Sequence, residues 1–112
     1  MSGAAPVEIV TVYAVFGSEA EAARIARIAV EERLAACANI LAPCRSVYRW
    51  QGSVEEAEEV PALFKTAAVT AEALIARIAA LHGYDVPAAV AWPIAAALPA
   101  DRAWVEEESG DA

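Results

Sequence analysis

The stretch EERLAACANILAPCRSVYRWQGSVEEAEEVPALFKT, residues 31–66, decides the fold because its pattern changes from helical to extended within one continuous segment. Its first six residues are good helix formers. Residues 46–51 then alternate between two sets of side chains, which is the two-residue period of a strand. β-Branched and aromatic residues return after Gln51-Gly52-Ser53. A short connection containing glycine between two such runs predicts a β-hairpin.

The two arms of this hairpin are unusually long. Each could reach about a dozen residues, whereas a strand usually has five or six, so the arms extend beyond a small domain. Tyr48 and Trp50 share one face of the first arm, where exposure to water would be unfavourable, and we expect a partner chain to cover them. Proline cannot donate to a ladder, which predicts a bulge or bend at Pro43 and a bulge or unpaired edge at Pro61.

The remainder of the chain predicts alternating strands and helices. Ser18 followed by Glu21 fits a capping box, and Thr70 is a candidate helix N-cap. Gly83 offers a left-handed helix stop, and Pro99 introduces a last helix. From these signals we expect strands at 7–16 and 88–94, helices from 18 to about 36, at 70–81 and at 100–108, and a frayed end after residue 108.

The resulting order is βαββαβ followed by a terminal helix. Right-handed crossovers then give a four-stranded antiparallel sheet with both main helices on one face, the ferredoxin-like α+β arrangement. The length of 112 residues predicts one domain, residues 1–112, with an ordered core at about 7–108. Large apolar side chains are scarce because 30 residues are alanine, which favours burial between subunits.

Composition argues against several classes of partner. Sixteen acidic residues against eight basic ones give a net charge of −8, so we expect no nucleic acid. The weakly polar run at 86–98 is short and broken by two prolines, so we expect no membrane span. Residues 1–6 lack the basic start and apolar core of a secretory signal. Cys37 and Cys44 are too far apart for a disulfide if the segment between them is extended, and we expect a cytoplasmic protein with reduced thiols.

Several runs of the chain form a recognisable series. They are E-E-R-L-A-A-C-x-N-I at 31–40, S-x-Y-R-W-x-G at 46–52, E-E-V-x-x-L-x-K-T at 58–66, the segment 82–87, Trp92-Pro93-Ile94 and Trp104. In order and spacing, this series resembles the CutA family, the divalent-cation tolerance proteins. The resemblance covers roughly residues 8–107. It implies a CutA1-like homotrimer without enzymatic activity, implicated in tolerance of or response to divalent metal ions, copper above all.

His82, the single histidine, is the candidate metal ligand. The chain has no C-x-x-C, H-E-x-x-H, glycine-rich phosphate loop or G-x-S-x-G motif, so we expect no enzyme. His82 could instead interact with free carbonyls at a helix end. The resemblance places family copper ligands at the positions of Ala14, Leu81 and His82, and only His82 has a ligating side chain. We therefore expect no firmly bound cofactor, with weakly bound Cu(II) or another divalent cation as the candidate.

The resemblance also implies a cleft. Glu59, Lys65, His82 and Tyr84 occupy recurrent family positions, and Cys37 joins this set as a thiol beside a helix end. Lys65 has two interpretations, because a lone ammonium in a strand could be a charge held in a subunit cleft or a residue that blocks edge-to-edge aggregation.

Tyr48, Trp50 and Trp92 are the residues expected at an interface between copies. Two further functions stay open: a trimeric small-molecule sensor resembling the PII signalling proteins, which share the fold, and a scaffold that only presents surfaces. A nucleotide sensor would need basic and glycine-rich loops, whereas residues 55–59 are mostly acidic. That acidic run fits a solvated face, with attraction of cations as the alternative.

Overall fold

The structure is a computed structural model, and it describes residues 8–110. Val7, expected in the first strand, and residues 1–6 lie outside the described residues. The elements are β1 Ile9–Phe16, α1 Glu19–Glu31, β2 Cys37–Ile40, β3 Cys44–Trp50, β4 Ser53–Ala67, a 3-10 turn Ala68–Thr70, α2 Ala71–Leu81, β5 Ala89–Pro93 and α3 Pro99–Glu108.

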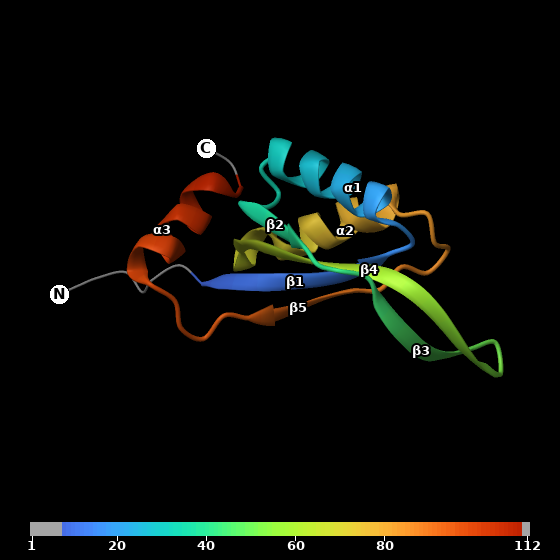
Figure 1. The fold of residues 1–112 in the computed structure, drawn as a ribbon. Coiled ribbons are helices and arrows are strands. Elements are labelled where there is room, and N and C mark those ends of the chain that lie inside the picture. Colours follow the sequence, from blue (N-terminus) through green and yellow to red (C-terminus); the bar gives the residue numbers. More distant parts are fainter. Residues whose placement is uncertain (1–7, 111–112) are drawn as a thin grey trace.

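The strands form an antiparallel sheet in the order β2-β4-β1-β5, and β3 pairs with the far half of β4. Helices α1 and α2 lie side by side on one face of this sheet, whereas α3 lies at the end away from the hairpin (Figure 1). The ferredoxin-like arrangement is therefore confirmed. The first arm of the hairpin consists of two strands, β2 and β3. The residues between them, 41–43, include Pro43, where a bulge or bend was expected.

The main core lies between the sheet and its two covering helices. Alternate residues of β1 point to the helices, and in β4 the residues opposite them do the same, as at Val12 and Phe64. The largest fully buried side chains of this core are Phe16, Phe64, Ile25, Leu74 and Ile78. The opposite, helix-free face carries the other set, which includes Tyr13, Leu63 and Trp92.

The hairpin extends beyond the sheet, as expected. Strand β4 has 15 residues, but β1 ends at Phe16 opposite Val60, so the part of β4 before Val60 pairs with β3 alone. Gln51 and Gly52 at the turn both have positive φ, 47° and 84°, as the two-residue hairpin turn requires. Figure 1 shows this two-stranded arm projecting from the body of the molecule.

The expected bulge or unpaired edge at Pro61 is wrong. Strand β4 runs through Pro61 in unbroken register, with Val15 opposite on β1. The N–H of Leu41 donates to the Pro61 carbonyl at 2.9 Å, so the polar backbone of Pro61 faces the β2 side. Strand β2 has already ended at Ile40. The missing N–H therefore removes one bond at a strand end, where the sheet tolerates proline.

Helix α1 begins where the capping box predicts and ends earlier than expected. The Ser18 hydroxyl accepts from the N–H of Glu21 at 3.1 Å. The helix stops at Glu31 rather than near residue 36, because Arg33 takes a left-handed φ of 63°. The N–H of Ala36 already donates to the Lys65 carbonyl of β4. Pairing with the sheet thus overrides the helix propensity of residues 32–36.

Ser109 and Gly110, which were expected to be frayed, are held by hydrogen bonds. The Ser109 hydroxyl accepts from the N–H of Ala67 at 3.1 Å and donates to the Val105 carbonyl. The N–H of Gly110 donates to the Arg33 carbonyl at 2.6 Å, and the Arg33 guanidinium donates to the carbonyls of Gly110 and Glu107. Helix α3 has no basic residue in its own last turn, so Arg33 supplies the missing cation from a distant element.

Two helix signals near α2 act differently from expectation. Thr70 precedes the helix, but its backbone is already helical (φ −98°, ψ −11°) and its side chain makes no capping bond. Gly83 follows the helix without a positive φ, so the predicted left-handed stop is wrong. Its N–H donates to Glu21 Oε2 at 2.7 Å, and a Cβ at this position would lie 2.8 Å from the same oxygen. A larger residue there would require the Glu21 carboxylate to move.

Candidate functional site

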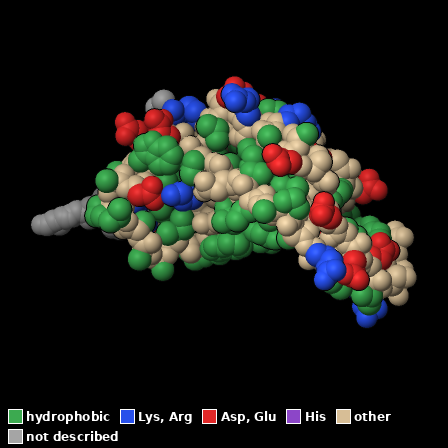
Figure 2. Space-filling view, in the orientation of Figure 1, with side chains coloured by type: hydrophobic (Ala, Val, Ile, Leu, Met, Phe, Trp, Pro, Cys, Tyr) green, Lys and Arg blue, Asp and Glu red, His purple; other side chains and the backbone are tan. Residues whose placement is uncertain are grey.

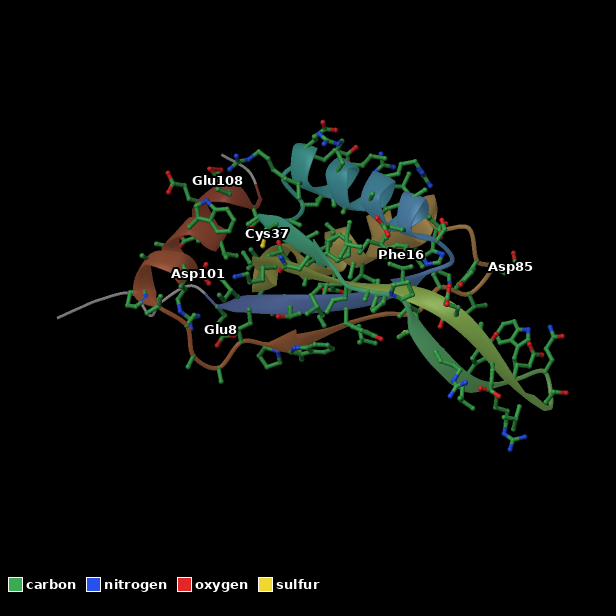
Figure 3. The ribbon with its side chains drawn as sticks, viewed as in Figure 1. Glu8, Phe16, Cys37, Asp85, Asp101 and Glu108 are labelled. Atoms are coloured by element: carbon green, nitrogen blue, oxygen red, sulfur yellow. The ribbon has the colours of Figure 1, made fainter. Side chains whose placement is uncertain are left out.

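The five residues expected in one cleft lie in two groups. Glu59, His82 and Tyr84 meet where β1 ends and the hairpin leaves the sheet, whereas Cys37 and Lys65 lie near α3. About 3.4 Å of strand per residue separates Glu59 from Lys65 by roughly 20 Å. Figure 3 labels Phe16, on which His82 stacks, and, near α3, Cys37 and Asp101.

His82 is buried, and both of its ring nitrogens have partners. The ring stacks on Phe16 with centroids 5.0 Å apart. Nε2 lies 2.7 Å from the Val15 carbonyl, and Nδ1 lies 3.1 Å from the N–H of Tyr84. A carbonyl only accepts and a backbone N–H only donates, so these partners assign the proton to Nε2 and the lone pair to Nδ1. In this arrangement, neither nitrogen offers a free lone pair to a metal ion.

Tyr84 joins His82 to an acidic side chain of the hairpin. Its hydroxyl donates to Glu59 Oε2 at 3.0 Å, and its ring lies 4.6 Å from that of His82. Burial, followed by the hydrogen bond to Glu59, raises the pKa of Tyr84 to about 12. Both causes disfavour the phenolate, because it would be poorly hydrated and next to a carboxylate.

The titration of Tyr84 gives a testable prediction. Its folded pKa lies above the ordinary value of 10.0, so the neutral phenol stabilises the fold fully below that pH and loses its contribution as the pH rises through about 12. In an ultraviolet titration of phenolate formation, Tyr84→Phe should remove the component with the highest pKa. Tyr48→Phe is the matched control and should leave that component. An unchanged high-pH end of the curve in Tyr84→Phe would contradict the assignment.

Glu21 organises the loops around His82, a role that its sequence position does not reveal. One carboxylate oxygen accepts from the N–H of Gly17 at 3.0 Å, and the other accepts from that of Gly83 at 2.7 Å. Glu21 thus connects the start of α1 to the loop after α2. The capping-box pattern finds Glu21 but concerns only local bonds, so the contact with Gly83 has no signal in the sequence.

The second group is built on an ion pair. Lys65 Nζ lies 3.1 Å from Asp101 Oδ2 in the first turn of α3, and both side chains are partly exposed. Cys37 lies opposite Lys65 in the β2 and β4 register and is a half-buried free thiol, as is Cys44. Sequence reasoning missed Asp101. An acidic residue in a first helical turn was its only signal, and that position is common for reasons of helix polarity.

Acidic residues are numerous but dispersed. Within residues 8–110, no group of three or more His, Cys, Asp or Glu side chains is arranged to hold a metal ion. Strand alternation directs Glu55 and Glu59 to one side of the hairpin and Glu56 and Glu58 to the other. Arg45 also lies 3.6 Å from Glu56. The acidic side chains of the hairpin therefore present dispersed negative charge on both sides of the ribbon.

The three expected interface residues are large and exposed. Tyr48, Trp50 and Trp92 retain 39%, 42% and 44% of their accessible surface. Trp92 stacks on Tyr13 across the helix-free face, with ring centroids 5.8 Å apart. Hydrophobic side chains gather along the side of the sheet opposite α1 and α2 (Figure 2). An apolar sheet face with several exposed aromatic rings is typical of a surface that binds another protein.

Comparison with known proteins shows the family to which this chain belongs. A model of the family described as CutA1 divalent ion tolerance protein matches residues 10–108. The chain belongs to the CutA1 family. The family resemblance of the sequence motifs is thereby confirmed, and the further comparisons agree with it.

Relatives of this CutA1 chain share most of its length. The divalent-cation tolerance protein CutA of Thermus thermophilus is 46% identical over 93 residues, which are 83% of this chain and 90% of that protein. Protein CutA of Mus musculus is 34% identical over 106 residues, 95% of this chain and 60% of that protein. These names describe cation tolerance for the bacterial protein and state no enzymatic reaction.

Solved CutA1 structures have the same fold. The divalent cation tolerance protein of Thermus thermophilus superposes with a TM-score of 0.88 at 43% identity, over 91% of this chain and 99% of its own. CutA1 of Oryza sativa gives a TM-score of 0.91 at 31% identity, over 96% and 98%. The similarity extends over nearly the whole chain, so the hairpin and α3 belong to the shared architecture.

The names of other relatives state different cellular compartments. A CutA of Arabidopsis thaliana, 32% identical over 92% of this chain and 57% of that protein, is called chloroplastic. A CutA of Archaeoglobus fulgidus, with a TM-score of 0.86 at 33% identity over 89% and 97%, is called periplasmic. No helix between residues 8 and 110 is long and apolar enough to cross a bilayer.

Proposed function

We propose that this CutA1 chain is a non-enzymatic homotrimer that acts in divalent-cation tolerance, copper above all. The family name and the names of its relatives support the role in cation tolerance. The observation that carries the assembly is the hairpin, which projects from the sheet with Tyr48 and Trp50 exposed. A subunit of this shape is incomplete by itself.

The hairpin has edges that no strand among residues 8–110 pairs with. An isolated two-stranded ribbon is marginally stable in water at best. Before Val60, β4 has β3 on one side and no strand of the described chain on the other. Val47 and Val54 are also exposed on the ribbon. A strand from a second copy could pair with this edge by β-augmentation, and a cyclic arrangement of three copies closes the contact without leaving an open end.

Localisation and chemistry follow from the same features. We infer a cytoplasmic protein, because Cys37 and Cys44 are free thiols, as a reducing compartment maintains them. We infer a binding protein rather than an enzyme, because the buried hydrogen bonds of His82 hold it in a structural role. The cation would then be a weakly held ligand of the assembly.

Cu(II) binding is expected to be weak and unselective at physiological salt. Tight Cu(II) sites use two or more nitrogen or thiolate ligands in fixed geometry, and His82 would have to give up a buried hydrogen bond to become one. Calorimetric titration of the reduced protein should show an affinity weaker than micromolar that falls with salt, as screening over about 8 Å requires. Submicromolar stoichiometric binding that is lost in His82→Asn would contradict this.

The role in tolerance is tested in cells. A bacterium whose own CutA family gene is deleted, and which is thereby sensitised to Cu(II), should regain growth when this chain is expressed. A variant that stays folded as a monomer is the matched control and should not restore growth. Failure of the parent chain to restore growth, although it is present as a trimer, would overturn the proposed role.

A further inference from the structure

Glu59 is a buried acidic residue with one side-chain hydrogen bond among residues 8–110. Glu59 retains only 8% of its accessible surface. Oε2 accepts from the Tyr84 hydroxyl at 3.0 Å, whereas Oε1 has no hydrogen-bond partner among residues 8–110. No basic side chain in that part of the chain forms an ion pair with it either. Buried carboxylates ordinarily have a cation or several donors as partners, so the Glu59 carboxylate can accept a further donor.

Arg45 and Lys65, the basic residues nearest to Glu59 in the sheet register, form ion pairs with other acidic residues. Arg45 is close in the ladder, but it lies opposite Glu58, and alternation directs its side chain to the other side of the ribbon, where it pairs with Glu56. Lys65 points to the same face of β4 as Glu59, but it binds Asp101 at the far end of the sheet. Among residues 8–110, Glu59 thus has one neutral donor and no ion pair.

The position of Glu59 indicates where a donor would come from. It lies one residue before Val60, at the point where β1 ends and the β4 edge becomes unpaired. Tyr84, its one partner, is itself partly exposed, and the aromatic residues of the hairpin lie on the same side of the ribbon as Glu59. This is the region that a second copy covers in the proposed trimer.

We propose that a basic side chain of a second copy enters this position and pairs with Glu59, so that the Glu59 and Tyr84 site is complete only in the assembly. The inference rests on the proposed trimer. A guanidinium or ammonium group suits the site because it supplies both the missing charge and the missing hydrogen-bond donor. A metal ion suits it less, since the described residues offer no third ligand nearby.

The decisive variant is Glu59→Gln. Glutamine keeps an acceptor oxygen for Tyr84 and nearly the same shape, but it removes the charge. If a partner cation binds there, the variant leaves that cation buried and unpaired, and the protein concentration at which the trimer half-dissociates should rise at least about tenfold. If Glu59 serves only Tyr84 within its own chain, removal of a buried charge should leave assembly unchanged or strengthen it.

Glu58→Gln is the matched control, because it makes the same chemical change one residue away on the other side of the ribbon. It should shift half-dissociation less than about twofold, as expected for an exposed charge. Sedimentation velocity over a dilution series measures both variants, and circular dichroism checks that they are folded. Equal dissociation of Glu59→Gln and the parent would overturn the inference.

Two further results separate this inference from the proposed function. A parent chain that is monomeric at micromolar concentration would contradict both the trimer and the inference. A trimeric parent whose half-dissociation is unchanged by Glu59→Gln would contradict the inference alone. The series is repeated in EDTA and in MgCl2. If Mg²⁺ strengthens assembly of the parent but not of Glu59→Gln, a metal ion rather than a basic side chain occupies the site, and the inference is overturned.

Discussion

Replacement of Trp50 by alanine is expected to destabilise the trimer by about 2 kcal/mol or more for each interface, while the isolated subunit keeps its fold. Trp50 is the last residue of β3, next to the hairpin turn and far from the core between the sheet and helices α1 and α2. Trp50 is 42% exposed in the single chain and lies outside the main core, so its truncation should cost the subunit little. A large aromatic ring buried by a partner accounts for a greater share of binding than most of the residues around it.

Trp104 provides a control of the same residue type and nearly equal exposure, 41%. It lies on α3, at the end of the molecule opposite the hairpin (Figure 1). Trimer dissociation is measured against denaturant and against dilution for Trp50→Ala, Trp104→Ala and the parent. Trp50→Ala should shift both transitions, and Trp104→Ala should shift them much less. A Trp50→Ala midpoint within error of the parent would place this residue outside any interface.

Replacement of Arg33 by alanine should cost about 2 kcal/mol of folding free energy, because the last turn of α3 loses its cap. The Arg33 side chain donates to the carbonyls of Gly110 and Glu107, at 3.1 Å and 2.5 Å. Its weaker contact with Glu108, at 3.5 Å and partly exposed, should contribute little. The loss should be local, so hydrogen exchange should accelerate most in α3.

Two companion variants test the physical role of Arg33. Arg33→Gly removes the same side-chain bonds but accommodates the φ of 63° without strain, and it should be about 1 kcal/mol more stable than Arg33→Ala. Arg27→Ala is the control, because the 3.8 Å pair of Arg27 with Glu31 is exposed and should contribute less than about 0.5 kcal/mol. Equal stability of Arg33→Ala and Arg27→Ala in urea unfolding would show that α3 does not depend on Arg33.

Local patterns in the sequence predicted the elements whose causes are local. The hairpin was predicted from its two-residue period and from the turn at Gln51 and Gly52, where both φ values are positive. The start of α1 was predicted from Ser18, whose hydroxyl makes the capping bond. In each case, the residues that form the element are neighbours in the chain, so their pattern is sufficient.

The errors concern residues whose partners are distant in sequence. Helix α1 was extended beyond Glu31 because residues 32–36 are good helix formers, and nothing local shows that Arg33 bonds to Gly110 or that Ala36 pairs with Lys65. Gly83 was predicted to adopt a left-handed conformation because it follows a helix, whereas in the structure its φ is not positive and it lies against the Glu21 carboxylate. Tertiary contacts override local propensity at such positions.

The candidate site shows the same division. Family resemblance selected Glu59, His82 and Tyr84, and the structure brings these three together. The resemblance did not separate them from Lys65, because it gives positions without distances. The sequence also could not show that both nitrogens of His82 are bonded within the chain, since one partner is the Val15 carbonyl, which carries no residue-type signal.

We expect two further copies of the chain to cover the helix-free face and the projecting hairpin. Multi-angle light scattering after gel filtration at micromolar concentration and physiological salt measures the number of copies. We predict one species with three times the 11.7 kDa mass of the chain. A single stable species at 11.7 kDa, with native circular dichroism, would contradict it.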